Sequence, residues 1–386
     1  MAVGALPVQC DPALLADIRR YGTFDSAACY QCGSCTLSCE LVADSATFPR
    51  KSIRYALLGL RAPLLAGLDP WICHDCGDCS AACPRQAEPR ISMVTLRRFL
   101  SAQYDWSGIT SKLLQSKAWY LGSLVSVAIL TFLLILGYHL WKVPMTVGQL
   151  ATTELGLEHM FPIIIYYTLV VVLLPLALLL SRVLRVWRWT MADRKIPLSA
   201  YTAEAWTYFY QSVTHSLMRK CPEKGRWRGH WMLACGTVVM LTIKTFGLHW
   251  FQTDNIYPIY NPQRWIGYLA AGFILYGIGD ILVGRWRKQK EIYKETKFND
   301  LVFPVLIVGV VLSGLAAHVL RYCGFGLSCH YAYALHVIIA TSLLLIEMSF
   351  GKWSHMVYRP LALYFRAVKE RAQHQAPAPE AVPHAI

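Results

Sequence analysis

The chain has 386 residues, of which 55% are hydrophobic and 16% are charged, and it carries a formal net charge of +14 with a mean hydropathy of +0.37. Such a cationic excess fits nucleic-acid binding only when the cations form a stripe with stacking aromatic residues, whereas here they lie in short loops between long apolar runs. The composition therefore excludes nucleic acid as a partner and excludes an ordinary soluble globular chain. We expect a multi-pass membrane protein with a soluble N-terminal part.

Short helices are predicted in the N-terminal part, at residues 12–18, 49–59 and 91–100. Apolar residues recur at helical spacing in the second of these stretches, for example at Ile53 and Ala56. No alternating β pattern accompanies them. We therefore predict a helical ferredoxin-like domain and not the β-hairpin kind.

Two cysteine runs lie among these helices: CYQCGSCTLSC begins at Cys29, and CHDCGDCSAACP begins at Cys73. Each run is C-x2-C-x2-C-x3-C, the spacing that binds [4Fe–4S] clusters, although the trailing proline of the second run is replaced by Glu40 in the first. Three thiolates of one loop reach three corners of a cube, and the fourth points at the other cluster. We assign one cluster to Cys29, Cys32, Cys35 and Cys83, and the other to Cys39, Cys73, Cys76 and Cys79.

Zinc and disulfides explain these runs less well. A structural zinc site takes four ligands in paired hooks and leaves no role for a third cysteine two residues further on. Disulfides need an oxidising compartment, and no export signal precedes the cysteine block. The total of 13 cysteines is odd, which also argues against a disulfide framework.

Six apolar segments follow, each about long enough to cross roughly 30 Å of hydrocarbon. They are Ala118–Leu140, Met160–Ser181, His230–Phe251, Trp265–Gly284, Leu301–Leu320 and Tyr331–Phe350. The loops 182–228 and 285–297 and the C-terminal tail are rich in Arg and Lys, whereas the alternate loops hold few cations. The positive-inside rule places these loops, both termini and the cysteine block in the cytoplasm, with the bundle in the cytoplasmic membrane.

Histidines on the third and sixth apolar segments have a spacing that suits haem. His230 and His249 lie on the third segment, and His336 and His355 lie on or just after the sixth, so that each pair is 19 residues apart, or roughly 28 Å of helix rise. Since the two segments run in opposite directions, His230 and His355 share the inner depth, while His249 and His336 share the outer depth. Two imidazoles from facing helices can ligate a b-type haem, and no C-x-x-C-H motif for a c-type haem is present. Any one of these histidines could instead be a satisfied interfacial residue.

Other residues near the outer depth offer alternatives to His249. They are His139, His159, His318, His330 and Met240. Lys244 lies between the two histidine levels, where it could donate to a quinone carbonyl, although snorkelling or an internal ion pair explains it equally well. The candidate acid–base groups at a quinone site are Lys244, Glu347 and His159.

Residues 29–105 closely resemble the C subunit of the heterodisulfide reductases, through CYQCGSCTLSCE, FPRKSIRYALLGL, PWICHDCGDCSAACPR and YDWSG. The membrane half resembles the cytochrome b subunit of the same enzymes and, more distantly, the gamma subunit of respiratory nitrate reductases. That likeness rests on RWRGHWMLACG around His230, and on YALHVIIA and FGKWSHMVYRPLALY around His336 and His355. Both halves in one chain resemble the family of C subunits of quinone-interacting membrane-bound oxidoreductases.

This resemblance implies a complex with two soluble flavin and Fe–S subunits similar to the A subunit of heterodisulfide reductase (QmoA and QmoB). It also implies electron exchange between menaquinone or ubiquinone and the adenylylsulfate reductase of dissimilatory sulfur metabolism. The nitrate reductase pattern implies that His230 and His355 bind the inner haem and that His336 binds the outer one. That pattern places the remaining ligand ten residues after the first, where this chain has Met240.

We therefore predict an all-α protein with three parts. Residues 1–110 form a cytoplasmic domain with two [4Fe–4S] clusters, residues 111–358 form a six-helix transmembrane bundle with two b haems, and residues 359–386 form a partly disordered cytoplasmic tail. The leading hypothesis is a membrane electron-transfer subunit that connects the quinone pool with soluble partner subunits. The alternatives are a haem-free membrane anchor for an Fe–S adaptor, and the equivalent subunit of another heterodisulfide reductase-like complex.

Overall fold

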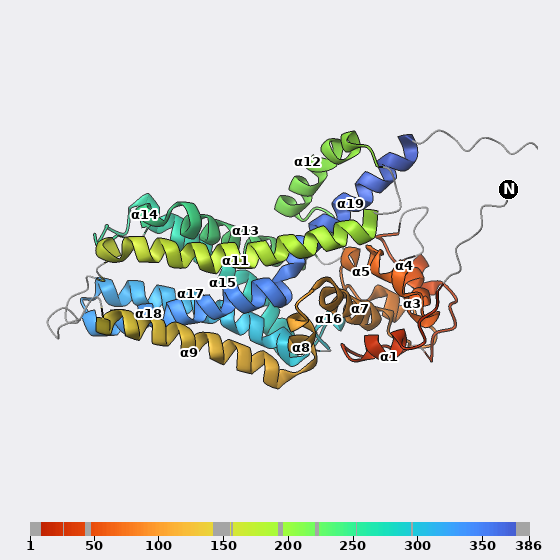
Figure 1. The fold of residues 1–386 in the computed structure, drawn as a ribbon, viewed down its shortest axis with the longest axis horizontal. Coiled ribbons are helices and arrows are strands. Elements are labelled where there is room, and N and C mark those ends of the chain that lie inside the picture. The colour runs from red at the N-terminus through yellow and green to blue at the C-terminus, as the bar shows by residue number, and fades with distance from the viewer. Residues whose placement is uncertain are drawn as a thin grey trace, which may run out of the picture. The chain divides into compact units, whose positions relative to one another are not determined.

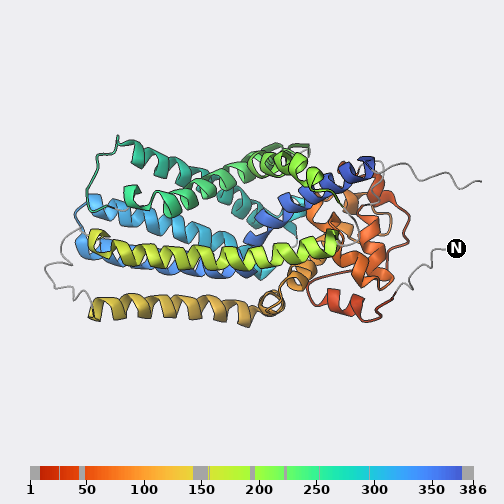
Figure 2. The ribbon, with the colours of Figure 1, turned by 45° about the horizontal axis from the view of Figure 1, so that its top comes forward.

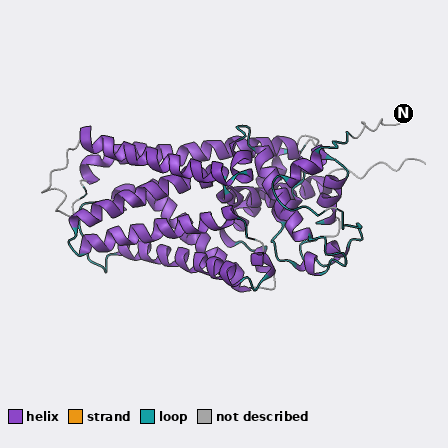
Figure 3. Ribbon diagram, turned by 90° about the horizontal axis from the view of Figure 1, so that it is seen from below, coloured by secondary structure: helices purple, strands orange, loops and turns teal. Residues whose placement is uncertain are grey.

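The computed structural model describes residues 9–25, 27–42, 48–141, 155, 157–191, 196–220, 224–251, 253–294 and 296–375. All regular elements within these ranges are helices, and no strand occurs there (Figure 3). The all-α class predicted from the sequence is therefore confirmed.

The chain folds as two compact units, each assembled from separate stretches of sequence. The first unit takes in Met1–Leu100, Val183–Lys220 and His355–Ile386, and the second takes in Ser101–Arg182 and Cys221–Ser354. The helices of the first unit are α1 (Leu14–Arg19), α2 (Ser34–Leu37), α3 (Arg50–Leu57), α4 (Arg61–Leu65), α5 (Asp69–Ile72), α6 (Asp78–Ala81), most of α7 (Pro89–Tyr104), α12 (Leu198–Thr214), the 3₁₀ turn η1 (Met218–Lys220) and α19 (His355–Gln375). Those of the second unit are α8 (Ile109–Gln115), α9 (Lys117–Trp141), most of α11 (Leu157–Met191), α13 (Lys224–Phe246), α14 (Leu248–Phe251), α15 (Pro262–Arg287), α16 (Glu291–Lys294), α17 (Phe298–Tyr322), α18 (Gly326–Ser342), the π-helix η2 (Leu343–Met348) and the 3₁₀ turn η3 (Lys352–Ser354).

The core of the first unit forms around α7. Met93, Leu96 and Leu100 recur at helical spacing on this helix and are completely buried, as are Leu14 and Ile18 of α1. Each such side chain contributes roughly 1.5–3 kcal/mol by leaving water. The short helices that carry the cysteines depend on this apolar strip, because none of them is long enough to be stable alone.

The C-terminal helix α19 belongs to the first unit and packs against α12. An ion pair joins them, with Arg371 Nε 2.6 Å from a carboxylate oxygen of Glu204. Residues 359–375, which were expected to lie in a tail, form most of this helix. The domain limits predicted from the sequence, at residues 110 and 358, separate the parts by the cofactor each would bind. The two units of the structure are separated by packing, so the predicted limits stay a prediction.

The second unit contains the long apolar helices. Among the described residues, five helices are long and apolar enough to cross a membrane: Lys117–Trp141, Ile163–Met191, Pro262–Arg287, Phe298–Tyr322 and Gly326–Met348. Helices α9, α17 and α18 lie side by side (Figure 1 and Figure 2). These five helices correspond to five of the six predicted segments.

The remaining predicted segment, His230–Phe251, differs from the helix that forms there. Helix α13 begins six residues earlier, at Lys224, and ends at Phe246, where the short α14 follows after Gly247. Its first turns carry Lys224, Arg226 and Arg228, and Lys244 lies near its end. These cations make it less apolar than the other long helices, although it packs extensively against α15.

Glycine allows α13 and α15 to approach closely. A Cβ added at Gly236 of α13 would lie 2.6 Å from the carbonyl oxygen of Ala270, and one added at Gly277 of α15 would collide with the carbonyl oxygen of Gly229. Small residues at such crossings are typical of membrane helix packing.

A buried ion pair stabilises the second unit where α11 passes the loop after α7. Arg182 Nη2 lies 3.1 Å from Asp105 Oδ1, and the two side chains are only 2% and 0% exposed. Burial alone would raise the pKa of Asp105, but hydrogen bonds from Ser107 and from the Thr110 N–H, together with Arg182, hold it below its usual value.

Replacing Arg182 by Met should lower the free energy of unfolding by about 3–5 kcal/mol, because the Asp105 carboxylate would stay buried without its cation. Thermal unfolding in detergent, followed by circular dichroism, measures this loss. The matched control is R188M, which removes an exposed arginine from the same helix and should change the midpoint little. Equal midpoints for the two variants would contradict the stabilising role of the pair.

Candidate iron–sulfur site

The two cysteine runs adopt the same backbone conformation. Gln31 and Asp75 occupy equivalent positions, with φ of 58° and 59°, and Gly33 and Gly77 follow two residues later with φ of 92° and 103°. Glycine is favoured at such angles because it has no Cβ. Each run then enters a one-turn helix, α2 or α6, which carries its third cysteine. The repeat visible in the sequence is thus also a structural repeat.

The first run lines a cavity of about 480 Å³, called cavity A here. Its cysteines are Cys29, Cys32, Cys35 and Cys83. Three come from the first run and the fourth from the second run.

The second run lines a smaller cavity of about 350 Å³, called cavity B. Its cysteines are Cys39, Cys73, Cys76 and Cys79. The structure thus brings together, in each cavity, the four cysteines that were assigned to one cluster from the sequence. Their role as ligands stays a prediction.

The sulfur atoms in both cavities have the surroundings of cluster thiolates. Cys29 Sγ accepts from Gln31 Nε2, Cys73 Sγ accepts from the Asp75 N–H and Cys83 Sγ accepts from the Ala87 N–H, all at 3.3 Å. Hydrogen bonds to sulfur are one of the features that set cluster potentials. All eight cysteines are among the described residues, and they form no disulfide.

Burial and mutual repulsion oppose ionisation of three of these thiols. Burial raises the pKa of Cys76 to about 12, and it also raises the pKa values of Cys35 and Cys79, with a further increase from the neighbouring cysteines. Four such thiols ionise together only where a cation compensates them, as the iron of a cluster does. The donor set therefore fits a [4Fe–4S] centre in each cavity.

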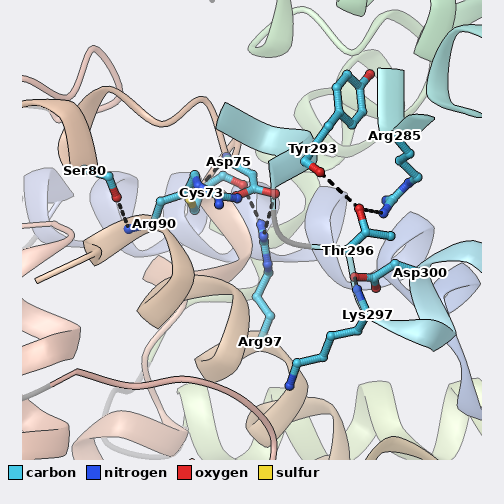
Figure 4. A network of polar contacts seen from close by, with 10 residues as sticks. All are labelled: Cys73, Asp75, Ser80, Arg90, Arg97, Arg285, Tyr293, Thr296, Lys297 and Asp300. Atoms are coloured by element: carbon cyan, nitrogen blue, oxygen red, sulfur yellow. Dashed lines mark hydrogen bonds and ion pairs between the residues drawn. The ribbon is translucent and has the colours of Figure 1, made fainter. Parts of the chain in front are cut away.

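Two arginines bind the loop of cavity B through Asp75 (Figure 4). Arg90, which lines the cavity, and Arg97 both form ion pairs with Asp75, at 3.2 Å and 3.8 Å. Arg97 also donates to the carbonyl oxygen of Cys73 at 2.9 Å. These contacts fix the loop that supplies the first cysteines of cavity B.

Comparison with known proteins agrees with this interpretation of the N-terminal part. Residues 28–88 match the family described as "4Fe-4S dicluster domain". The chain is 32% identical over 88 residues to a protein of Archaeoglobus profundus that is named for its likeness to the C subunit of heterodisulfide reductase, an alignment that covers 22% of this chain and 47% of that protein. The chain thus spans about half the length of the curated relative it matches. No solved structure matches it significantly.

The chain therefore contains a 4Fe–4S dicluster domain at its N-terminal end, followed by helices able to span a membrane. This combination suggests an Fe–S electron-transfer role and an oxidoreductase-type subunit. The matches cover the Fe–S part alone, so they leave haem and quinone as predictions.

His336 has the environment of an oriented metal ligand. It lies on α18, and its Nδ1 lies 2.9 Å from the carbonyl oxygen of Val310 and 3.3 Å from Ser313 Oγ, both on α17. A metal-binding histidine characteristically donates its other ring N–H to a carbonyl in this way. Gly314 leaves room beside the ring, because a Cβ there would lie 3.1 Å from His336 Cε1.

The other predicted haem ligands are placed less completely. His230 lies in the second turn of α13 and belongs to the second unit, whereas His355 is the first residue of α19 and belongs to the first. Their pairing stays a prediction. The side chains of His249 and His159 lie outside the described residues.

Two of the alternative outer ligands have protein partners. His318 Nε2 lies 2.6 Å from the hydroxyl of Tyr268, and His330 Nδ1 lies 2.8 Å from the carbonyl oxygen of Gly326. Lys244 lies within electrostatic range of His336, and Met240 precedes it by four residues on the same face of α13. This placement keeps Met240 as a candidate partner of His336.

Glu347 is buried within the π-helix η2. One carboxylate oxygen accepts from the hydroxyl of Tyr120, and the other accepts from the N–H of Lys352 at 2.9 Å. The amino group of Lys352 pairs instead with Asp300. π-Helical turns within α-helices are frequent at functional sites.

Two residues beside cavity B, His74 and Arg359, were not predicted from the sequence. His74 is 2% exposed and lies between two cavity B cysteines. Arg359, on α19, donates to its ring. The sequence could have indicated His74, because it lies inside the second cysteine run. Nothing in the sequence near Arg359 connects this residue to the cysteines.

Replacing one cysteine should remove one centre and leave the other. C83S and C32S should both lose the centre of cavity A, while C39S and C76S should both lose that of cavity B, so non-haem iron should fall from about eight to about four atoms per chain. Iron analysis and electron paramagnetic resonance (EPR) of the reduced protein distinguish the two pairs.

The matched control for these variants is C323S, which changes an exposed cysteine of the second unit. It should keep both signals. If C83S instead removed the same signal as C76S, the fourth cysteine of each run would serve its own loop, and the assignment by cavity would be wrong.

Proposed function

We propose that this chain is the membrane subunit of an electron-transfer complex. It exchanges electrons between the quinone pool and soluble flavin and Fe–S subunits, through b haems and two [4Fe–4S] clusters. The observation that carries the proposal is the pair of cavities, each lined by three cysteines of one run and one of the other. When bound, the clusters and haems would supply the one-electron carriers for this transfer.

Neighbouring cavities support transfer between the two clusters. Helices α2 and α6, which follow the two glycine turns, pack against one another. Cys35 of cavity A lies within electrostatic range of Cys79 of cavity B. The crossed fourth cysteines therefore hold the two centres close together as well as binding them.

The membrane unit would hold the haems through histidines. His336 offers an imidazole that Val310 orients from the neighbouring helix, and Met240 or His249 would complete that site. His230 and His355 would hold the inner haem.

Glu347 is the group best placed to carry a proton for quinone chemistry. Reduction of a quinone takes up two protons, so a buried site for this reaction needs a group that can exchange them. The Glu347 carboxylate is buried and accepts hydrogen bonds from a tyrosine hydroxyl and a peptide N–H. Both groups can stay in contact with the side chain when it takes up a proton. Lys244 and His159 remain further candidates.

The soluble partners in this proposal are two proteins similar to the A subunit of heterodisulfide reductase, and through them adenylylsulfate reductase. The relative from Archaeoglobus profundus is named for its likeness to the C subunit of heterodisulfide reductase, which supports membership in a complex of that general type. The dicluster domain and both termini would face the cytoplasm, because the cationic loops 182–228 and 285–297 favour that side.

The haem proposal predicts an absorption spectrum. The purified protein, reduced with dithionite, should show the α band of b-type haem, and this band should weaken or disappear in H230A and in H355A. The matched control is H374A, which removes an exposed histidine near the end of α19 and should leave the band intact. A folded wild-type preparation without haem would leave the chain as an Fe–S membrane anchor.

Glu347→Gln should slow quinol-dependent reduction of the clusters by about 10²–10⁴-fold, the usual contribution of a positioned acid–base group. The control D280N changes an exposed acid on α15 and should retain the rate. Stopped-flow absorbance with a soluble quinol measures both variants. A wild-type rate in E347Q, with haem and iron contents unchanged, would remove Glu347 from the proton route.

A further inference from the structure

The two cysteine loops have the same backbone but different surroundings. The residue after the first cysteine is Tyr30 in one loop and His74 in the other. Tyr30 is 68% exposed, and the guanidinium of Arg85, a residue near it in cavity A, lies 4.4 Å from the centre of its ring. His74 is 2% exposed. The loop of cavity B is therefore covered at the point where the loop of cavity A is open.

The element that covers His74 is α19. Arg359 of this helix donates to His74 Nδ1, and its Nη2 lies 3.2 Å from Nε2 of the same ring and 3.5 Å from the carbonyl oxygen of Ile72. Close by, the rings of Trp71 and Tyr358 pack with their centres 4.9 Å apart. Helix α19 thus contacts the chain immediately before Cys73 as well as the residue immediately after it.

The charge of Arg359 acts on cavity B. Its contacts with the imidazole and with the carbonyl oxygen are contacts with neutral groups, and the Cys73 thiolate lies within its electrostatic range. Addition of one electron makes an iron–sulfur centre more negative. A nearby cation therefore stabilises the reduced form and raises the reduction potential.

We propose that Arg359 is a positioning residue for the centre in cavity B: it fixes the loop that carries Cys73 and holds a positive charge beside that centre. The inference rests on the proposed function, in which cavity B holds a [4Fe–4S] cluster. It deepens that function by distinguishing the two centres, since Tyr30, which stands in the loop of cavity A where His74 stands in that of cavity B, is exposed.

The position of Arg359 also indicates which centre lies nearer the predicted inner haem along the chain. Arg359 follows His355 by four residues on α19, about one helical turn or roughly 6 Å of rise. Both residues belong to the first unit. The predicted inner-haem ligand His355 and the contact to the Cys73 loop therefore share one turn of helix, whereas cavity A has the exposed Cys32, which suits it to exchange electrons with a soluble partner.

The test is an EPR-monitored redox titration of the full-length protein in detergent, comparing R359M and R359K with the wild type. The C32S and C76S variants assign the two signals. We expect R359M to shift the reduction equilibrium of the cavity B centre about tenfold toward the oxidised form, which is about 59 mV for one electron, and to leave cavity A unchanged. R359K keeps the charge and should stay within about twofold of the wild type.

Arg85→Met is the matched control, because Arg85 contacts Tyr30, the residue of the other loop that is equivalent to His74. It should leave the cavity B potential unchanged. An unchanged cavity B potential in R359M at full iron content would overturn the proposal, as would an equal shift in R359K and R359M.

If R359M loses iron, R359Q is titrated in its place, because glutamine keeps an N–H donor without the charge. Loss of iron from both variants with helical content retained would assign Arg359 a purely structural role and would also overturn the proposal. Absence of haem from the wild type would count against the proposed membrane function alone, since the cluster potentials remain measurable without it.

Discussion

Repulsion among thiolates is the constraint on which the N-terminal unit depends. Each cavity gathers four cysteines, and burial together with neighbouring cysteines raises the pKa of Cys35 in cavity A and of Cys76 and Cys79 in cavity B. Iron removes this cost by binding the thiolates, so folding of the two loops and binding of the clusters are coupled. The crossed fourth cysteines, Cys83 and Cys39, extend the coupling, because neither cavity is complete until both loops are in place.

Most of this site could be predicted from the sequence because its geometry is local. A C-x2-C-x2-C spacing with a glycine after the second cysteine restricts the backbone to a tight loop, and Gly33 and Gly77 do adopt the left-handed angles that such a loop needs. Long apolar segments were equally predictable, since hydropathy and length suffice to indicate a membrane helix. Helix α13 begins before its predicted limit, because its first turns carry cations that a hydropathy pattern does not assign to a membrane segment. Its close packing with α15 at Gly236 holds these turns in the helix despite their low hydropathy.

The contact between Arg359 and His74 could not be predicted in this way. The two residues are 285 positions apart, and neither periodicity nor motif relates them. Such contacts follow from how α19 packs on the first unit, which is a property of the whole fold. The same limit applies to Tyr120 and Glu347, which are 227 positions apart and meet only because α9 packs against the π-helix. Cysteine and histidine spacing identified the candidate ligands. The residues that contact the candidate site from distant parts of the chain could be found only in the folded structure.

The buried acidic residues of the second unit are of two kinds: Asp105 and Asp300 form ion pairs, whereas Glu347 is bound by hydrogen bonds. Asp105 and Arg182 are both buried and neutralise each other, so protonation of Asp105 would leave the buried Arg182 charge without its counterion. Asp300 is buried and pairs with the partly exposed Lys352. Glu347 differs, because its carboxylate is held by a tyrosine hydroxyl and by a backbone N–H. Its negative charge is costly in an apolar bundle, and uptake of a proton relieves that cost without breaking an ion pair. The π-helical turn displaces Glu347 from the regular helical register and places its carboxylate against the Tyr120 hydroxyl and the Lys352 N–H, a distortion that is frequent at functional sites.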